Sequence, residues 1–312
     1  MKIRLVTTSD AGFKPLMAKI LGRRDTRAGD VEKRVEGIIT AVQRQGDRAV
    51  LRYTAQFDHV RLRAAQMEVT PAEIASAVAQ VSRKDLRILR LAAKRIAAFH
   101  RRQLLKSWQY RDPLGMVLGQ RITPLERVGV YVPGGKASYP STVLMNTIPA
   151  KVAGVKEIVM TSPIGAAGAI ILAAAHVAGV DRIFRVGGAQ AIAALAFGTR
   201  TIPKVDKIVG PGNIFVATAK RMVFGEVNID SIAGPSEILL LADDSADPAH
   251  VAADMLSQAE HDELAAALCV TTSKAVAHKV QRAVEQQLIS TKRRAISLRS
   301  LQEYGAIIVA RG

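Results

Sequence analysis

The chain has 312 residues, of which 49% are hydrophobic and only 4% are aromatic, and its formal net charge is +17. That length can bury one or more ordinary cores, and the aliphatic bias is typical of α/β layers. No apolar run approaches the roughly eighteen residues of a membrane-spanning helix. The single cysteine, Cys269, excludes a disulfide within the chain. Because the N-terminus also lacks the apolar core of a signal peptide, we expect a cytoplasmic protein.

The positive charge is concentrated in residues 83–102, which hold eight lysines and arginines. A nucleic-acid or anionic-membrane surface is one interpretation of such a segment. The cations alternate at helical spacing with apolar residues, namely Leu86, Leu89, Leu91, Ile96 and Phe99. No set of aromatic residues for base stacking accompanies them. We therefore favour a helix with one solvated basic face, and expect neither a nucleic-acid nor a membrane partner.

The first third of the chain is predicted to be helical. Apolar residues at 31, 35, 38, 39 and 42 fall on one helical face, so residues 30–45 form a helix, and a short one follows over 49–56. Thr70, Pro71 and Glu73 make a capping box that starts another helix. Ser82 and Asp85 start a long one that runs to about Gln103. Residues 1–105 contain no recognisable chemical motif.

The pattern changes near Gly115, where short strands are predicted over 115–122 and 127–132. From there strands over 158–160, 181–185 and 207–209 alternate with helices over 169–178, 189–197 and 213–222. This order predicts a parallel sheet with helices on its faces. Right-handed crossovers would bring every glycine-rich turn to one edge of the sheet, where ligands bind in open α/β folds.

A second α/β segment follows, with strands over 237–242, 265–271 and 305–310 and helices over 248–260 and 274–288. We therefore predict an α/β protein with parallel sheets and a helical N-terminal segment.

Four turns are candidates for ligand binding. Tyr131 leads into Pro133-Gly134-Gly135, and Gln190 follows Gly187-Gly188, but neither turn has the GxGxxG spacing of ordinary dinucleotide sites. Asn213 follows Gly210-Pro211-Gly212 and heads a helix, so capping alone would explain it. Ser236 lies in a turn before a strand, where a serine commonly satisfies nearby backbone groups.

The segment Ser257-Gln258-Ala259-Glu260-His261-Asp262 is the most informative. Gln258 and His261 are three residues apart at the predicted end of a helix, so both side chains would project from one face. Imidazole nitrogen and amide oxygen can both bind zinc, although zinc usually takes about four ligands. A lone histidine at a helix end is more commonly a capping or surface residue.

Together these segments resemble the histidinol dehydrogenase family. The resemblance is carried by six motifs in the family's order and spacing: YVPGG at 131–135, STVLMNTIPAKVAGV at 141–155, VGGAQAIAALAFGT at 186–199, PKVDKIVGPGN at 203–213, DSIAGPSEILLLAD at 230–243 and LSQAEHD at 256–262. The N-terminal GDRAVLRYTAQFD at 46–58 fits as well.

The resemblance implies an oxidoreductase of histidine biosynthesis, which oxidises L-histidinol to L-histidine through L-histidinaldehyde. NAD+ and Zn2+ would be its cofactors, and the complete enzyme would be a homodimer. The family fold implies two Rossmann-like α/β domains, the first made of residues 1–127 and 239–312 and the second of residues 128–238, inserted in the first. By motif match, Tyr131, Gln190 and Asn213 would contact NAD+, and Ser236 would contact the substrate. Gln258 and His261 would ligate zinc and touch the substrate.

The resemblance also implies a departure from the family. The family's catalytic Glu-His pair, two further zinc ligands and a tail that crosses to the partner subunit would all lie beyond Gly312, so no catalytic base is assigned in this chain. Three alternatives stay open: a short inactive homologue, a relative that oxidises another alcohol, and a basic nucleic-acid binder.

Overall fold

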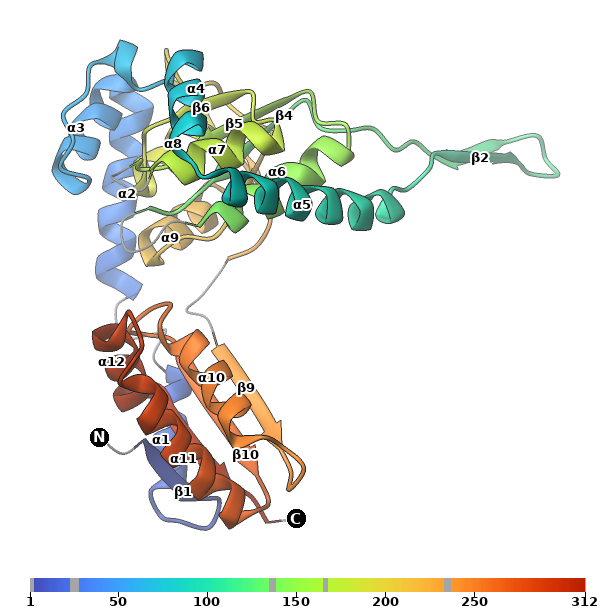
Figure 1. The fold of residues 1–312 in the computed structure, drawn as a ribbon. Coiled ribbons are helices and arrows are strands. Elements are labelled where there is room, and N and C mark those ends of the chain that lie inside the picture. Colours follow the sequence, from blue (N-terminus) through green and yellow to red (C-terminus); the bar gives the residue numbers. More distant parts are fainter. Residues whose placement is uncertain (1–2, 23–27, 135–138, 165–167, 233–236, 312) are drawn as a thin grey trace. The chain divides into compact units, whose positions relative to one another are not determined.

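A computed structural model describes residues 3–22, 28–134, 139–164, 168–232 and 237–311 (Figure 1). The chain divides into two compact units. One contains residues 1–28 and 233–312, and the other contains residues 29–232. Both are α/β units built around parallel sheets, as the alternation of strands and helices predicts.

The first unit holds a four-stranded parallel sheet in the order β1-β11-β10-β9. Its strands are β1 (Arg4–Thr7), β9 (Glu237–Ala242), β10 (Ala266–Thr271) and β11 (Gly305–Val309), and its helices are α1 (Phe13–Gly22), α10 (Pro248–Ala259), α11 (Lys274–Leu288) and α12 (Arg294–Tyr304). The strands predicted near 237, 265 and 305 are confirmed. β1, α1 and α12 were not predicted. β1 pairs along its whole length with β11, so its stability comes from residues about 300 positions away.

The second unit holds a five-stranded parallel sheet in the order β6-β5-β4-β7-β8. The strands are β4 (Arg127–Tyr131), β5 (Glu157–Thr161), β6 (Arg182–Phe184), β7 (Lys207–Val209) and β8 (Asn228–Ile229), and the connecting helices are α6 (Pro140–Val152), α7 (Gly168–Ala178), α8 (Gly188–Phe197) and α9 (Ile214–Val223). The chain builds outward from β4 in one direction to β6, then returns to the other side of β4 for β7 and β8. The point where the order reverses, between β4 and β7, is the position at which open α/β sheets bind ligands.

The two faces of this sheet carry different helices. Val128, Val130 and Met160 pack into a core with α6 and α7, whereas Tyr131 and Val159 pack into a core with α8 and α9. Successive strand residues point to opposite faces, which explains the alternation. The N-terminal helices complete both layers: α2 (Ala28–Gln45) and α3 (Asp47–Phe57) join α8 and α9, and α4 (Pro71–Gln80) and α5 (Arg83–His100) join α6 and α7 (Figure 1).

The predicted helix starts are confirmed. The Thr70 side chain accepts a hydrogen bond from the Glu73 amide at 3.3 Å, and the Glu73 carboxylate accepts from the Thr70 amide at 2.8 Å. The Ser82 side chain caps α5 at the Asp85 amide. Along α5, Leu89 is buried, but Leu91 and Phe99 are exposed, so the packed face is narrower than the apolar pattern predicts.

Residues 29–127, which the family resemblance assigns to the first domain, lie in the second compact unit. α4 packs on α7 and α5 on α6. Between α3 and α4, the Val69 amide donates to the Ile183 carbonyl at 2.8 Å, and Met67 and Phe184 are fully buried. Helical periodicity identifies the buried face of a helix but not the sheet that it covers.

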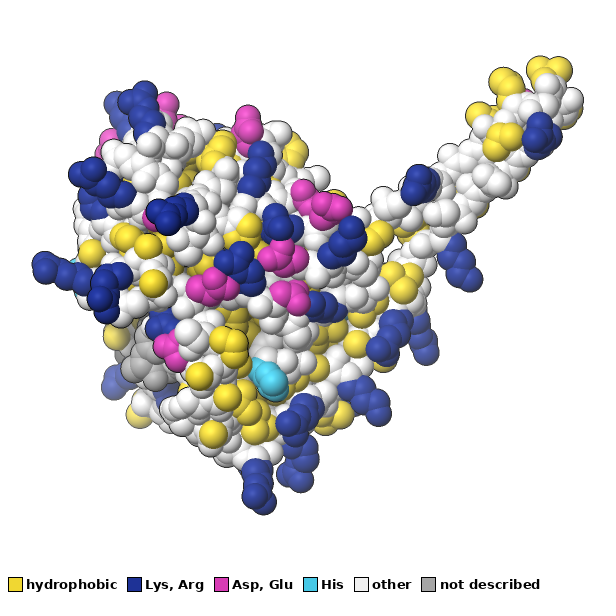
Figure 2. All heavy atoms as spheres, turned by 90° about the horizontal axis from the view of Figure 1, so that it is seen from above, with side chains coloured by type: hydrophobic (Ala, Val, Ile, Leu, Met, Phe, Trp, Pro, Cys, Tyr) yellow, Lys and Arg dark blue, Asp and Glu magenta, His cyan; other side chains and the backbone are white. Residues whose placement is uncertain are grey.

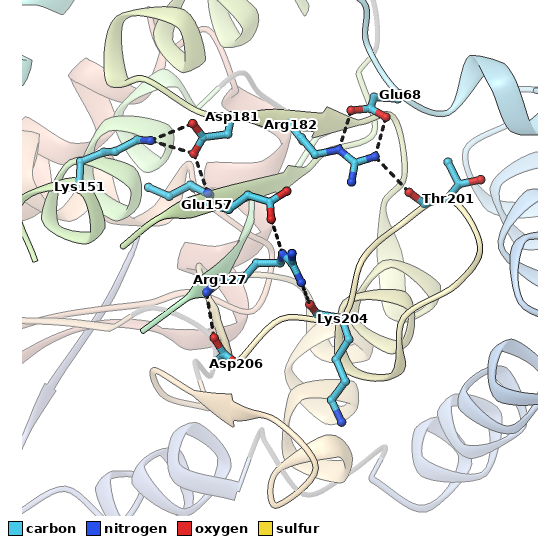
Figure 3. A network of polar contacts seen from close by, with 10 residues as sticks. Glu68, Arg127, Lys151, Glu157, Asp181, Arg182, Thr201, Lys204 and Asp206 are labelled. Atoms are coloured by element: carbon cyan, nitrogen blue, oxygen red, sulfur yellow. Dashed lines mark hydrogen bonds and ion pairs between the residues drawn. The ribbon is translucent and has the colours of Figure 1, made fainter. Parts of the chain in front are cut away.

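Charged side chains connect the amino ends of the strands in the second unit (Figure 3). Arg127 at the start of β4 pairs with Glu157 at the start of β5, and its amide donates to Asp206 before β7. Arg182 at the start of β6 makes two hydrogen bonds to Glu68, of 2.8 and 2.7 Å. This edge is therefore closed by the protein's own ion pairs.

A two-stranded antiparallel arm, β2 (Trp108–Arg111) and β3 (Val117–Gln120), extends from the second unit (Figures 1 and 2). All residues of its two strands are exposed, and its large apolar side chains are Trp108, Tyr110, Leu114, Met116, Val117 and Leu118. An isolated hairpin is at best marginally stable in water.

Among the helices of the described ranges, none combines the length and the apolar character that a membrane span requires.

Candidate functional site

The glycine-rich turns of the second unit meet at the carboxyl edge of its sheet. A Cβ atom on Gly134, after β4, would lie 2.5 Å from the carbonyl oxygen of Pro163, after β5, and one on Gly187, after β6, would lie 2.8 Å from the same proline's ring. On the other side of β4, a Cβ on Gly210 would lie 2.1 Å from the Tyr131 carbonyl oxygen. The predicted meeting of these turns is confirmed. Glycine allows this close backbone approach.

Tyr131 ends β4 and points to the face that α8 and α9 cover. Its side chain is 3% exposed, and its hydroxyl accepts a hydrogen bond from the Gly188 amide at 3.2 Å. Burial is the main cause that raises the pKa of Tyr131 to about 12; the Gly188 hydrogen bond opposes it, and the nearby Asp58 charge adds to it. The phenol therefore keeps its proton at neutral pH and can donate it.

Gln190 lies in the first turn of α8 and is completely buried. Its oxygen lies over the preceding turn, because a Cβ on Gly188 would be 2.6 Å from it. Within the described part of the chain, neither the oxygen nor the nitrogen of this amide has a hydrogen-bond partner. A buried polar group without a partner costs about 1–3 kcal/mol, so this amide is a strong candidate for ligand contact.

Two more buried polar atoms lie beside these residues. Thr161 ends β5 directly opposite Tyr131, and its hydroxyl lacks a partner in the described ranges, as does Oδ2 of Asp58 after α3. Burial raises the pKa of the Asp58 carboxyl, and a hydrogen bond from the Gly187 amide opposes the shift. Sequence reasoning missed both residues. The position of Thr161 at a strand end was an available signal, whereas nothing local distinguished Asp58.

Asn213 lies at the N-terminus of α9 and is exposed. Its side-chain oxygen accepts hydrogen bonds from the amides of Phe215 at 3.1 Å and Val216 at 3.2 Å. The capping explanation that the sequence offers is therefore correct. Capping uses the side-chain oxygen, so the two N–H groups of the side-chain amide take no part in the cap.

Gln258 and His261 lie in the first unit. Gln258 is in the last turn of α10, but the helix ends at Ala259, so His261 lies in the following turn, where its amide donates to the Gln258 carbonyl at 3.2 Å. That one face carries both side chains stays a prediction. The side-chain nitrogen of Gln258 is buried without a partner among the residues described. Ser236 lies outside the described residues.

Comparison with known proteins identifies the family. The sequence profile of histidinol dehydrogenase matches residues 21–312. The chain belongs to the histidinol dehydrogenase family. A histidinol dehydrogenase from Syntrophotalea carbinolica is 57% identical over 311 residues, which cover 99% of this chain and 72% of that protein. One from Aquifex aeolicus is 50% identical over 311 residues, which cover 100% of this chain and 72% of the relative.

The fold agrees with the family. The crystal structure of histidinol dehydrogenase from Elizabethkingia anophelis superimposes with a TM-score of 0.87 at 35% sequence identity, and the match covers 99% of this chain and 71% of that one. The chain thus spans about 70% of the length of these histidinol dehydrogenases.

Proposed function

We propose that this chain takes part in the NAD+-dependent oxidation of L-histidinol to L-histidine through L-histidinaldehyde, the last step of histidine biosynthesis, in the cytoplasm. Membership of the histidinol dehydrogenase family supports the reaction. The observation that carries the cofactor assignment is the fully buried Gln190 amide, whose two polar atoms lack partners in the described structure.

The carboxyl edge of the second sheet fits a dinucleotide. Tyr131 ends β4 and Asn213 ends the turn after β7, so they lie at either side of the point where the strand order reverses. Gln190 lies in the helix whose first amide binds the Tyr131 hydroxyl. In this proposal, the Gln190 amide both donates to and accepts from NAD+, and Asn213 donates through its side-chain nitrogen. NAD+, when bound, supplies the hydride acceptor. The protein's part is to orient it and to exclude water.

Gln258 and His261 are proposed to contact L-histidinol and to supply two zinc ligands, and Ser236 is proposed to contact the substrate. Zinc usually takes four ligands. No group of three or more His, Cys, Asp or Glu side chains placed to hold a metal occurs in the described ranges. The described residues therefore supply only part of a zinc site.

The function is tested by incubating the protein with NAD+ and L-histidinol and following NADH by absorbance, beside titration of NAD+ binding. We expect NAD+ binding and NADH formation that depends on L-histidinol. Faster turnover of another amino alcohol would instead identify a relative with a different substrate. NAD+ binding without turnover of any alcohol would favour a non-catalytic homologue, and failure to bind NAD+ would contradict the cofactor assignment.

The zinc assignment makes a separate prediction. Gln258→Ala and His261→Ala should each lower the zinc content of the purified protein, because each removes one ligand from the metal. His278→Ala is the control, since it removes an exposed histidine from α11 in the same unit. Elemental analysis that finds equal zinc in all three variants would contradict the assignment.

We also propose that the protein forms a homodimer through the β2-β3 arm. Trp108, Tyr110 and Leu118 share one face of the arm, because Tyr110 lies opposite Leu118 and the two aromatic rings stack at 6.3 Å. Residues 107–120 carry one arginine and one aspartate, so this segment has no net charge. In a chain of net charge +17, this segment adds no charge of its own to the repulsion between two copies.

The dimer proposal predicts that Trp108→Ser combined with Tyr110→Ser lowers the molar mass in solution from that of a dimer toward that of a monomer. Aromatic side chains of this size dominate the energetics of interfaces. Light scattering measures the mass. Phe224→Ser is the control, since Phe224 is an aromatic residue at least as exposed as Trp108 and Tyr110 but lies at the end of α9. An unchanged mass in the double variant would rule out the arm as the dimer contact.

A further inference from the structure

A buried lysine lies behind the turn that carries Asn213. Lys220, on α9, is only 2% exposed, and its ammonium donates a hydrogen bond to the carbonyl oxygen of Gly210 at 2.9 Å. It also forms an ion pair with Oδ1 of Asp230. A buried charge is costly unless it is paired and hydrogen-bonded, so a lysine here needs an explanation.

Lys220 and Asp230 together bind the backbone of one residue of the turn, Gly210. Asp230 follows β8, and its second oxygen, Oδ2, accepts a hydrogen bond from the Gly210 amide at 2.8 Å. Lys220 and Asp230 thus hold both backbone groups of Gly210, the donor and the acceptor. Asp230 is itself fixed to the sheet, because its amide donates to the Ile208 carbonyl at 3.2 Å.

The contacts of Lys220 and Asp230 with Gly210 lie where the strand order of the sheet reverses, between β4 and β7. Gly210 is the first residue after β7, and its backbone approaches Tyr131 at the end of β4 more closely than a side chain would allow. Gly210 also begins the turn that leads, three residues later, to Asn213. Whatever fixes Gly210 therefore fixes the turn that joins β7 to the start of α9.

Stability alone does not explain the choice of these residues. Replacing a buried ion pair with well-packed apolar side chains is commonly neutral or stabilising. An ion pair that holds both the N–H and the C=O of one residue instead fixes a backbone conformation, which apolar packing does with less precision. Fixed backbone is what a site requires when its ligand must lie close to the main chain.

We infer that Lys220 and Asp230 are positioning residues, which hold the turn Gly210–Asn213 in the shape that receives NAD+. The inference rests on the proposed function, since it takes NAD+ as the ligand of this turn. Neither side chain needs to touch the cofactor, because both act through the backbone of Gly210.

The test uses the full chain and the variants Lys220→Met and Lys220→Met combined with Asp230→Asn. The double variant removes the charge that the single variant leaves without its partner, so it keeps the fold if the single variant does not. Two quantities are measured: the dissociation constant for NAD+ by calorimetry, and hydrogen exchange of the Gly210 amide without cofactor. Both variants should raise the dissociation constant about tenfold, the value of one misplaced hydrogen bond, and should speed exchange at the Gly210 amide, which Asp230 holds.

Arg182→Met is the matched control. It breaks a partly buried ion pair of the same unit, to Glu68, at the opposite edge of the sheet (Figure 3). It should lower the melting temperature but change the dissociation constant less than about twofold. Equal effects of Arg182→Met and Lys220→Met on NAD+ binding would overturn the positioning role. If the unaltered chain does not bind NAD+, the proposed function fails. In that case hydrogen exchange alone tests whether Lys220 and Asp230 fix the turn. Unchanged exchange of the Gly210 amide in Lys220→Met would show that they do not.

Discussion

Gly210→Ala is expected to lower the free energy of unfolding by about 2–5 kcal/mol, the sum of backbone strain and a steric clash. Gly210 has a φ of +113°, which side-chain-bearing residues rarely adopt, and its Cβ would lie 2.1 Å from the Tyr131 carbonyl oxygen. The obstacle is backbone, and it cannot yield easily, because β4 is a central strand paired on both sides. The same substitution should abolish NAD+ binding, since the turn must move.

The strain and the clash can be measured separately. Gly225 has a similar φ of +107°, but a Cβ there would meet nothing within 4 Å. Gly225→Ala should therefore cost only the strain, about 1 kcal/mol. Urea denaturation of both variants at 25 °C gives the difference. If both lose the same stability, the sheet relaxes around the new methyl group and the clash carries no cost.

The strands β4 to β7 of the second sheet were predictable because they and the turns that follow them are locally encoded, whereas the two-residue β8 was not predicted. Continuous apolar runs such as Ile158-Val159-Met160 end at proline or glycine, and the repeated strand-turn-helix order predicts parallel pairing with every turn at one edge. β1 and α12 were not predictable in this way. β1 has four residues, and its partner in the sheet, β11, is fixed only by the tertiary fold.

The residues of the candidate site also fall into two groups, those that local sequence patterns predict and those that only tertiary packing brings together. Tyr131, Gln190 and Asn213 stand directly beside glycine-rich turns, so their common location follows from topology alone. Asp58 and Thr161 complete the buried polar group only through packing of α3 and β5 against α8, which no local pattern reveals. From the sequence, Lys220 is indistinguishable from any cation in the last turn of a helix. Its burial is possible because it pairs with Asp230, ten residues away.

Gln190→Met is expected to change stability and binding in opposite directions. Methionine has nearly the same length and shape as glutamine but no hydrogen-bonding groups, so it removes two buried polar atoms that have no partner in the described structure. Without cofactor, the variant should be more stable by about 1–3 kcal/mol, the cost of the orphaned amide. If NAD+ is the partner that the amide lacks, the variant should bind it at least about tenfold more weakly.

Such a trade of stability for binding is the signature of a ligand-contacting residue, and it separates this role from a packing role. The control is Gln281→Met on α11, because the Gln281 amide donates to the Ile3 carbonyl at 2.7 Å and so already has its partner. That variant should lose stability and leave NAD+ binding unchanged. Denaturant unfolding with calorimetric titration measures both quantities. A loss of stability in Gln190→Met would show that its amide is satisfied within the protein and would remove the main argument for its contact with the cofactor.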